Sequence, residues 1–299
     1  MADFVAGTVA GCAGQIVGHP LDSIKTRLQS EALLTSSSGQ RRRQTSAYRC
    51  ARSIYSEGGI GIRSFFRGLS LPLLSKGFEQ SVAFGIKNAA DELVRDSRAV
   101  EGNAVLRTGL SGAAAGATTA TLLTPVYLVK VGLQVTSKHG QHGLAGPMAV
   151  IRNTYSKLGV AGLYTGAVPI LIGTSIGYAC RFVTYEQATG AMQTELGLGR
   201  SGACIVGGGL AGMATWASHY PLDLVSSRME ASVALGAKRR SMTGHFRQIY
   251  AESGVRGFYR GLGPCLLRAF PVNAAIFVTH DFVRSKLGCA SWIQSSFGK

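Results

Sequence analysis

Residues 20–29 have the sequence PLDSIKTRLQ, and they follow an apolar, glycine-rich stretch that reads GTVAGCAGQIVGH. The apolar stretch is typical of a membrane helix, which Pro20 would kink. Asp22 and Lys25 are three residues apart, so a helix places their charges close together on one face. Charges near the end of a membrane span are costly unless they are paired or hydrated, so both residues are candidates for a functional site. An ordinary helix start in a soluble protein has the same local pattern.

The pattern around Pro20 returns twice along the chain. Pro125 begins the sequence PVYLVKVGLQ, and Pro221 begins PLDLVSSRME. Two glycines four residues apart precede each proline, the first of them 13 residues upstream, and these pairs are Gly7/Gly11, Gly112/Gly116 and Gly208/Gly212. Downstream of each proline, an aromatic residue and a glycine flank one polar residue at 66–68, 164–166 and 259–261. Three ordered features in three registers indicate a chain built from internal repeats.

With these features the chain resembles the mitochondrial carrier family over essentially its whole length. The family pattern is P-x-[DE]-x-x-[KR], repeated three times and followed each time by an aromatic residue, a basic residue and glycine. The resemblance implies an all-α membrane protein of six transmembrane helices in three pseudo-symmetric repeats, with three short amphipathic helices on the matrix side. It also implies alternating access between two salt-bridge gates, a place in the inner mitochondrial membrane, a monomeric state and no cofactor.

The repeats are expected at residues 1–100, 101–199 and 200–299, which together form one transport domain. Transmembrane helices are expected at about residues 4–29, 69–94, 104–134, 167–193, 202–230 and 262–287. Short helices are expected at about residues 47–56, 147–157 and 243–252, and a loop over residues 31–46.

Composition favours a membrane protein over a soluble enzyme. The 299 residues have a mean hydropathy of +0.18 and only 15% are charged, yet no segment is a clean apolar span of about 20 residues. Helices whose charges face a hydrated interior fit both observations, and 40 glycines fit close helix packing. The net charge of +16 gathers in connecting segments such as residues 41–52 and 238–240. Charge placed beside apolar spans favours an anionic membrane surface over a nucleic-acid partner.

Several other functional classes lack their motifs in this chain. Six cysteines show no C-x-x-C, and His139 and His142 have no third ligand nearby, so we expect no disulfide and no metal site. We find no nucleophile with its base and no phosphate loop, so we do not expect an enzyme. The first apolar stretch begins at Phe4, so targeting is expected to use internal segments, as the resemblance implies.

The resemblance predicts a matrix gate in which the acid of each odd-numbered helix pairs with the base of the next. Carried onto this chain, Asp22 pairs with Lys130, and Asp223 pairs with Lys25. The third pair is missing, because its positions are Tyr127 and Ser226. Glutamines that brace the family's gate correspond to Gln29 and Gln134.

A cytosolic gate is predicted on the even-numbered helices, with the family pattern [FY]-[DE]-x-x-[RK]. The fourth transmembrane helix has Glu186, and the sixth has Asp281 and Arg284. The second has Lys87, Asn88 and Asp91 at the aromatic, acidic and basic positions, so both signature charges are lost, and Glu186 with Arg284 is the remaining pair. Two pairs on the matrix side against one on the cytosolic side predict a resting state closed toward the matrix.

The predicted substrate contacts lie on the even-numbered helices at cavity depth, and they are Ser75, Lys76, Glu79, Gly173, Thr174, Arg181 and Arg268. Arg268 falls at the family's third substrate contact, and an arginine can fork onto a carboxylate. Glu79 suits an amine or a guanidinium. Residues 78–84, 123–130 and 267–275 resemble the ornithine, basic amino acid and carnitine branch, so the resemblance implies a cationic or zwitterionic substrate.

The chain departs from that branch on its fourth transmembrane helix. The branch has an arginine and an acid where this chain has Gly173 and Thr174, and Arg181 is the candidate replacement eight residues later. Four bases, Lys76, Lys87, Arg181 and Arg268, outnumber the acid Glu79, which favours instead a dicarboxylate, a keto acid or a nucleotide. A carrier-fold adaptor without transport and a carrier of protons or ions are further alternatives.

Glycines at helix N-termini predict lipid sites. Free N–H groups and the helix dipole favour a phosphate there. The resemblance implies cardiolipin at these positions, which are Gly68, Gly166, Gly261, Gly146 and Gly244.

Overall fold

The chain is helical throughout the part that its computed structural model describes, which is residues 2–37, 47–56, 61–66, 69–95, 103–138, 147–234, 240–259 and 262–287. Its long helices are α1 (Ala2–Ser37), α3 (Ser70–Arg95), α4 (Ala104–Lys138), α6 (Ala167–Thr194), α7 (Arg200–Ala234) and α9 (Leu262–Lys286). Its short helices are α2 (Ala47–Ser56), η2 (Gly61–Phe66), α5 (Pro147–Leu163) and α8 (Met242–Gly257). The predicted all-α fold class is therefore confirmed.

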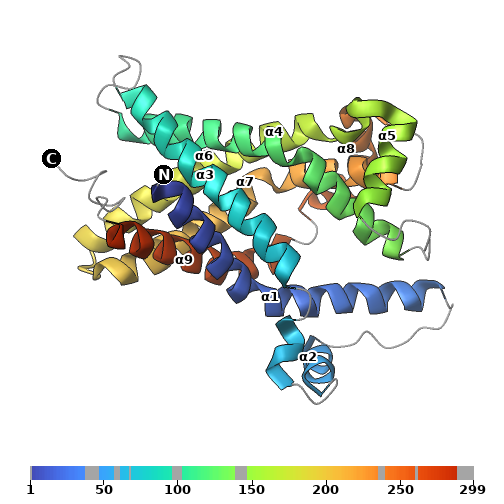
Figure 1. Ribbon diagram of the computed structural model, residues 1–299, viewed down its shortest axis with the longest axis horizontal. Helices are drawn as coiled ribbons and strands as arrows, with labels where there is room; N and C mark the ends of the chain where they lie inside the picture. Colours follow the sequence, from blue (N-terminus) through green and yellow to red (C-terminus); the bar gives the residue numbers. More distant parts are fainter. Residues whose placement is uncertain are drawn as a thin grey trace.

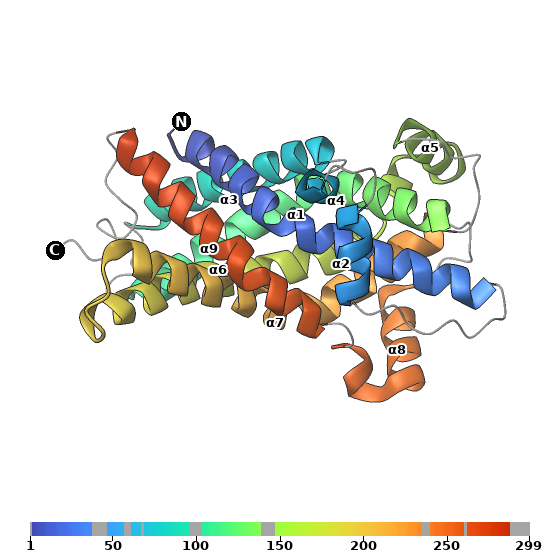
Figure 2. The same cartoon turned by 90° about the horizontal axis from the view of Figure 1, so that it is seen from below.

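The long helices form a closed ring in the order α1, α3, α4, α6, α7 and α9, in which each helix contacts the next and α9 returns to α1 (Figures 1 and 2). The first turn of α1 and the last turns of α9 lie at one end of the ring, which we call the terminal end. The short helices α2, α5 and α8 lie at the opposite end, which we call the short-helix end (Figure 1).

The first long helix of each predicted repeat continues through its proline. Pro20, Pro125 and Pro221 lie inside α1, α4 and α7. Helix α1 changes direction part-way along its length (Figure 1), as expected where a proline removes a backbone hydrogen bond. Helix α1 also runs on to Ser37, so the loop predicted from residue 31 is helical over its first turns. Residues 38–46 lie outside the described part of the chain.

Glycines permit close contact between neighbouring helices of the ring. A Cβ atom on Gly7 would lie 2.7 Å from the carbonyl oxygen of Gln80 on α3. A Cβ atom on Gly112 would lie 2.9 Å from the carbonyl oxygen of Tyr178 on α6. Backbone cannot move aside as a flexible side chain can, so these positions exclude larger residues.

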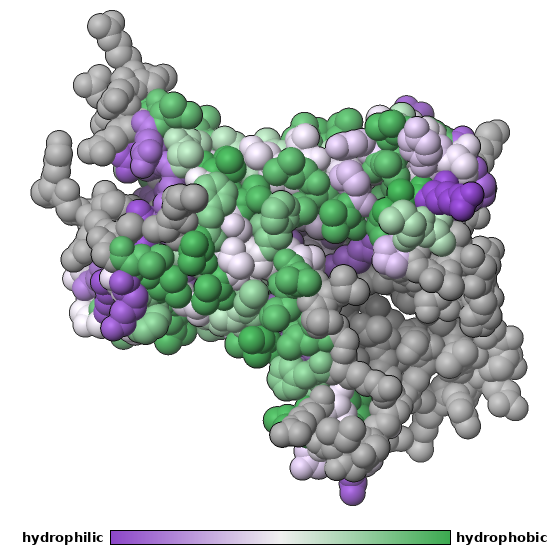
Figure 3. Space-filling model, viewed as in Figure 1, coloured by the Kyte–Doolittle hydropathy of each residue, from purple (hydrophilic) through white to green (hydrophobic). Residues whose placement is uncertain are grey.

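On the face shown in Figure 3, apolar side chains gather over the middle and most polar ones lie toward the two ends. Among the described residues, two helical segments are long and apolar enough to cross a membrane by length and composition. They are Ala104–Gly132 and Ala167–Thr194. The other long helices carry more charge, and much of it points into the ring, as described below.

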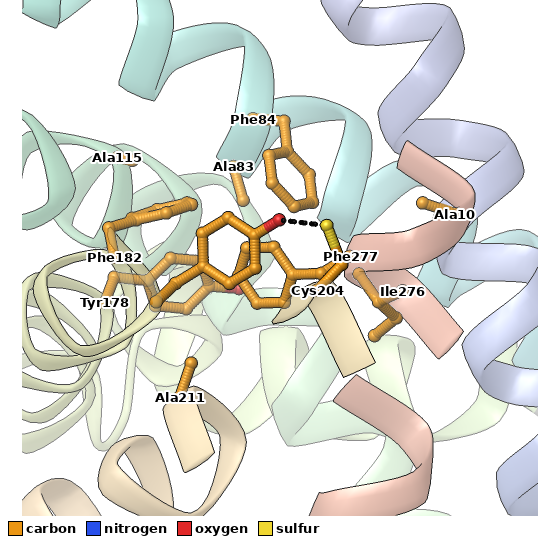
Figure 4. Close-up of a cluster of buried hydrophobic side chains, with 11 residues drawn as sticks. Ala10, Ala83, Phe84, Ala115, Tyr178, Phe182, Cys204, Ala211, Ile276 and Phe277 are labelled. Atoms are coloured by element: carbon orange, nitrogen blue, oxygen red, sulfur yellow. Dashed lines mark hydrogen bonds between the residues drawn. The ribbon is translucent and has the colours of Figure 1, made fainter. Parts of the chain in front are cut away.

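The core of the ring is an aromatic cluster contributed mainly by α3, α6 and α9 (Figure 4). Phe84, Phe182 and Phe277 meet edge to face, with ring centroids 5.6–6.4 Å apart. Tyr185 stacks on Phe277 with centroids 3.8 Å apart. Such pairs add stabilisation beyond the area they bury. The cluster closes the interior of the ring between its middle and the terminal end.

Candidate functional site

An arginine and an aspartate are joined across the interior of the ring. Arg268 of α9 donates from Nη2 to Oδ2 of Asp22 over 2.8 Å, and its Nε atom lies 2.8 Å from Oδ1. A hydrogen bond between two charged groups is stronger than one between neutral groups. The Arg268 and Asp22 side chains keep 25% and 32% of their exposure, so water reaches both. In this conformation Asp22 is engaged by a predicted substrate contact, and its predicted pair with Lys130 remains a prediction.

A second pair lies on α3. The Nζ atom of Lys76 donates to both carboxylate oxygens of Glu79, over 2.7 and 2.8 Å. Tyr178 of α6 donates its hydroxyl to the same carboxylate over 3.4 Å. Glu79 is only 9% exposed, so Lys76 supplies the counter-charge that a buried carboxylate needs.

Lys130 of α4 links the two pairs. Its ammonium is close enough to Lys76, Glu79, Asp22 and Arg268 to interact with all four charges. We call these five residues, Asp22, Lys76, Glu79, Lys130 and Arg268, the central charge cluster. Four different helices of the ring contribute to it, on the short-helix side of the aromatic cluster.

Other predicted substrate contacts are not brought into this cluster. Gly173 lies against α7, where a Cβ atom added to Gly173 would be 3.1 Å from the Cβ atom of Leu222. The Thr174 hydroxyl donates within its own helix, to the carbonyl of Ile170. Ser75 is exposed. These three residues remain predictions as substrate contacts.

Arg181 lies deeper in the ring than the central charge cluster. Only 3% of it is exposed. Its guanidinium is surrounded by the rings of Phe84, Tyr178, Phe182 and Phe277. It also interacts electrostatically with Glu79. The structure thus places the predicted replacement for the missing arginine close to Glu79, within the aromatic cluster.

The predicted pairing of Glu186 with Arg284 is not the one observed. Glu186 of α6 binds Lys87 of α3, with Nζ 3.3 Å from Oε1, and accepts a 2.5 Å hydrogen bond from the hydroxyl of Thr108. The two charged side chains are 2% and 8% exposed. Lys87 also lies 3.9 Å from Asp91, which in turn is 3.3 Å from Nε of Arg107.

The charges of α9 at the terminal end are held by its two neighbours in the ring. Arg284 pairs with Asp3 of α1 over 3.1 Å in this conformation, and its predicted pair with Glu186 remains a prediction. Asp281 pairs with Arg200, the first residue of α7, over 2.6 Å. Sequence reasoning counted Lys87 among the bases but missed its pairing with Glu186, because Lys87 occupies the aromatic position of the family pattern. It missed Arg200 because that residue lies outside the pattern. A lone lysine in an apolar stretch, four residues before an aspartate, was the available indication.

The remaining residues of the predicted matrix gate are described only in part. Asp223 lies on α7 within the described residues and has interactions there. The side chains of Lys25, Gln29 and Gln134 lie outside the described part of the chain. The predicted pair of Asp223 with Lys25 therefore remains a prediction.

A pocket of about 300 Å³ lies beside Gly166, between the start of α6, the end of α7 and the start of α8. Gly166 caps α6 with φ of 85°, a conformation that favours glycine. Arg240 lines the pocket, and nearby the N–H of Gly244 donates to Ser241 over 3.2 Å. A helix N-terminus and an arginine together favour an anionic group. Gly68, Gly146 and Gly261 lie outside the described residues.

Comparison with known proteins adds three findings. A family model described as "Mitochondrial carrier protein" matches residues 1–98, 102–196 and 199–290. The "Mitochondrial basic amino acids transporter" of Bos taurus is 35% identical over 286 residues, which cover 95% of this chain and 91% of the relative. The "Mitochondrial carnitine/acylcarnitine carrier-like protein" of Arabidopsis thaliana is 32% identical over 303 residues, covering 96% of this chain and 98% of the relative.

Proposed function

The chain belongs to the mitochondrial carrier family, and we propose that it moves a cationic or zwitterionic metabolite by alternating access. As a member of this family it is a multi-pass protein of the inner mitochondrial membrane. In the proposal, the six long helices span the membrane as three repeats of one transport domain. The protein works as a monomer without a cofactor, the terminal end faces the cytosolic side, and the short-helix end faces the matrix.

The central charge cluster carries this proposal. Glu79 and Arg268 face the interior of the ring from different helices, and each already holds an internal partner of opposite charge. A molecule with a carboxylate and a cationic group replaces both partners, its carboxylate taking the place of Asp22 and its cationic group the place of Lys76. Exchanging one ion pair for another keeps charges compensated throughout, so binding remains reversible.

This exchange also couples binding to gating. When a substrate carboxylate occupies Arg268, Asp22 is released, and Lys130 is the nearby base that the family pattern assigns to it. The substrate thereby promotes closure of the matrix gate. The terminal end is already closed by Lys87 with Glu186 and by the aromatic cluster. In this proposal the described conformation is closed toward the cytosolic side, whereas the sequence predicted a resting state closed toward the matrix.

The relatives' names agree with the proposed substrate class. One relative is named for basic amino acids and another for carnitine and acylcarnitine. Amino acids and carnitine alike combine a carboxylate with a cationic group. Glu79 and Arg268 supply one charge of each sign for such a molecule.

An anionic substrate is the second candidate, and the charge balance favours it. The central charge cluster and Arg181 together contain four bases, Lys76, Lys130, Arg181 and Arg268, against two acids, Asp22 and Glu79. The net charge of these six groups is 4 − 2 = +2. That excess suits a dicarboxylate, a keto acid or a nucleotide.

Cardiolipin is the proposed lipid partner, in the pocket beside Gly166. The pocket combines a helix N-terminus with Arg240, which suits one phosphate of a lipid headgroup. Arg240→Gln is expected to lower the stabilisation that added cardiolipin gives in detergent, whereas Arg247→Gln, on the exposed surface of α8, leaves it unchanged.

Thermal unfolding of the purified protein in detergent, with a panel of solutes, tests the substrate class. A bound ligand raises stability by about 2.7 kcal/mol at a hundredfold excess over Kd. We expect shifts with L-lysine, L-arginine, L-ornithine or L-carnitine that are lost in Glu79→Gln and Arg268→Ala and kept in Glu252→Gln. A shift with nucleotides or dicarboxylates that ignores Glu79→Gln overturns the assignment in favour of the second candidate. If no solute shifts the transition, the chain is better described as a membrane adaptor.

A further inference from the structure

Arg181 occupies a cage of aromatic rings. Its Cζ atom lies 5.0 Å from the ring centroid of Phe277, 5.5 Å from Tyr178, 5.7 Å from Phe84 and 5.9 Å from Phe182. We call these four rings the aromatic cage. They come from α3, α6 and α9, one from each repeat and a second from α6. Cation–π attraction holds the guanidinium there, and this attraction is stronger at a desolvated site than at an exposed one.

The aromatic cage leaves part of the guanidinium unsatisfied. Nε and Nη2 of Arg181 are buried, and neither makes a well-aligned hydrogen bond to a described residue, although the Tyr178 hydroxyl lies within hydrogen-bonding range of the guanidinium. These two nitrogens form one edge of the planar group, with the spacing of the two oxygens of a carboxylate. Buried donors without an acceptor are costly, so a planar anion that reaches this edge is bound firmly.

No neighbouring acid is bonded to this edge. Glu79 is the acid that interacts with Arg181, but both of its oxygens accept from Lys76. The Glu186 carboxylate, farther toward the terminal end, is bound by Lys87 and Thr108. The positive charge of Arg181 is therefore not cancelled by an acid bonded to it.

We propose that the Nε–Nη2 edge of Arg181 binds the carboxylate of the transported molecule within the aromatic cage. The carboxylate reaches this edge after it has left Arg268, on its way toward the terminal end. This inference rests on the proposed transport function. It explains how a chain with Gly173 in place of the branch's arginine still binds a carboxylate on α6. A carboxylate at this edge also draws Arg181 away from the rings of Phe84, Phe182 and Phe277, which close the terminal end, so its arrival loosens that closure.

Matched ligand pairs test the proposal. L-lysine and cadaverine differ by the carboxylate alone, as do L-carnitine and β-methylcholine. Binding of each is measured by thermal shift in wild type, Arg181→Lys, Arg181→Met and the control Arg152→Lys on the exposed face of α5. We expect both Arg181 variants to weaken binding of the carboxylate ligand by at least about tenfold. Binding of the decarboxylated partner should stay the same, and the control should match wild type.

Two results would overturn the proposal. One is an equal loss for both members of a pair, which indicates a purely structural role for Arg181. The other is no loss for the carboxylate ligand in either variant. Lysine keeps the charge and methionine suits an aromatic surrounding, so at least one variant is expected to fold.

The same variants separate this proposal from the function it rests on. If wild type responds to neither pair but to malate or 2-oxoglutarate, the proposed substrate class fails. The Arg181 proposal then still requires both variants to weaken that ligand at least about tenfold. If no carboxylate of this panel stabilises wild type, both proposals fail together.

Discussion

The terminal end and the central charge cluster hold similar ion pairs in different surroundings. At the terminal end, the Lys87 and Glu186 side chains are 2% and 8% exposed and lie beside packed aromatic rings. At the level of the central charge cluster, Arg268 and Asp22 have better pairing geometry but are 25% and 32% exposed. The comparison teaches that solvation, rather than hydrogen-bond geometry, separates a pair that locks the fold from a pair that a ligand can replace.

The physical basis is the cost of leaving a charge alone. A buried charge whose partner is removed has neither water nor a counter-ion, whereas a half-exposed one is rehydrated. The terminal end should therefore respond to single substitutions through stability, and the central charge cluster should respond through ligand binding. The predictions below test that division from the largest expected effect to the smallest.

Lys87→Met is expected to have the largest effect. It strands the Glu186 carboxylate in a dry site, at a cost of roughly 3–5 kcal/mol in the free energy of unfolding. The double variant Lys87→Met/Glu186→Met should recover much of this loss, because neither charge is then left unpaired. Thermal unfolding in detergent measures the loss in Lys87→Met, in Glu186→Met and in the double variant. A loss in the double variant that equals the sum of the two single losses would contradict a buried pair.

Gly112→Ala tests the close contact of α4 with α6 near the aromatic cage. The added methyl group meets the backbone of Tyr178 and Ala179 at 2.9–3.0 Å, so we expect a loss of about 1–3 kcal/mol. Gly109→Ala on the same helix is the matched control, since its methyl group has only Val183 near it, at 3.7 Å. Equal unfolding temperatures for the two variants would show that the helices are not in close contact here.

Asp22→Asn should alter function more than stability. Water reaches both side chains of the pair, which are 25% and 32% exposed, so the expected loss in unfolding free energy is about 1 kcal/mol. Because Arg268 is released, carboxylate ligands should bind up to about fivefold more tightly, the equivalent of that energy. Transport of the ligand by exchange should nevertheless slow, because Lys130 loses the carboxylate with which it pairs in the closed matrix gate. Weaker ligand binding in this variant would contradict competition between Asp22 and the substrate.

Arg228→Gln is expected to have the smallest effect. Its pair with Glu252 spans 3.0 Å on the exposed surface, where solvent screens the interaction. A hydrogen bond from Gln248 and the nearby Arg228 lower the pKa of Glu252 below its ordinary value of 4.5. A lowered folded-state pKa contributes stability that is present above the ordinary pKa and is lost as pH falls through the folded-state pKa. We therefore expect a barely measurable fall in unfolding temperature at pH 7, and we expect this difference between the two proteins to disappear in acid.

Much of the architecture was predictable because backbone requirements recur along the chain. The spacing of Gly7 and Gly112 from their prolines reflects helix contacts that the structure shows directly. The start of α4 at Ala104 and of α6 at Ala167 agree with the predicted boundaries. The extension of α1 to Ser37 was missed, because a run of good helix formers was outweighed by the serine-rich residues that follow.

Partner choice among charges was not predictable in the same way. A motif specifies which residue type stands at a position, whereas an ion pair depends on which helices approach and on conformation. Lys87 was discounted because it stands at an aromatic position, yet its long side chain reaches Glu186. Asp22 was assigned to Lys130 from a pattern that describes a closed gate, whereas the conformation described here offers it Arg268.

Exchange across cardiolipin-containing liposomes tests the central claim most directly. Liposomes are loaded with unlabelled L-lysine, L-ornithine or L-carnitine, and uptake of the labelled compound is followed for wild type, Glu79→Gln, Arg268→Ala and the control Glu252→Gln. The account predicts saturable exchange of at least one of these compounds in wild type and the control, and its loss in the other two variants. Exchange of malate or ADP that proceeds equally well in Glu79→Gln, with no exchange of the three zwitterions, would contradict it.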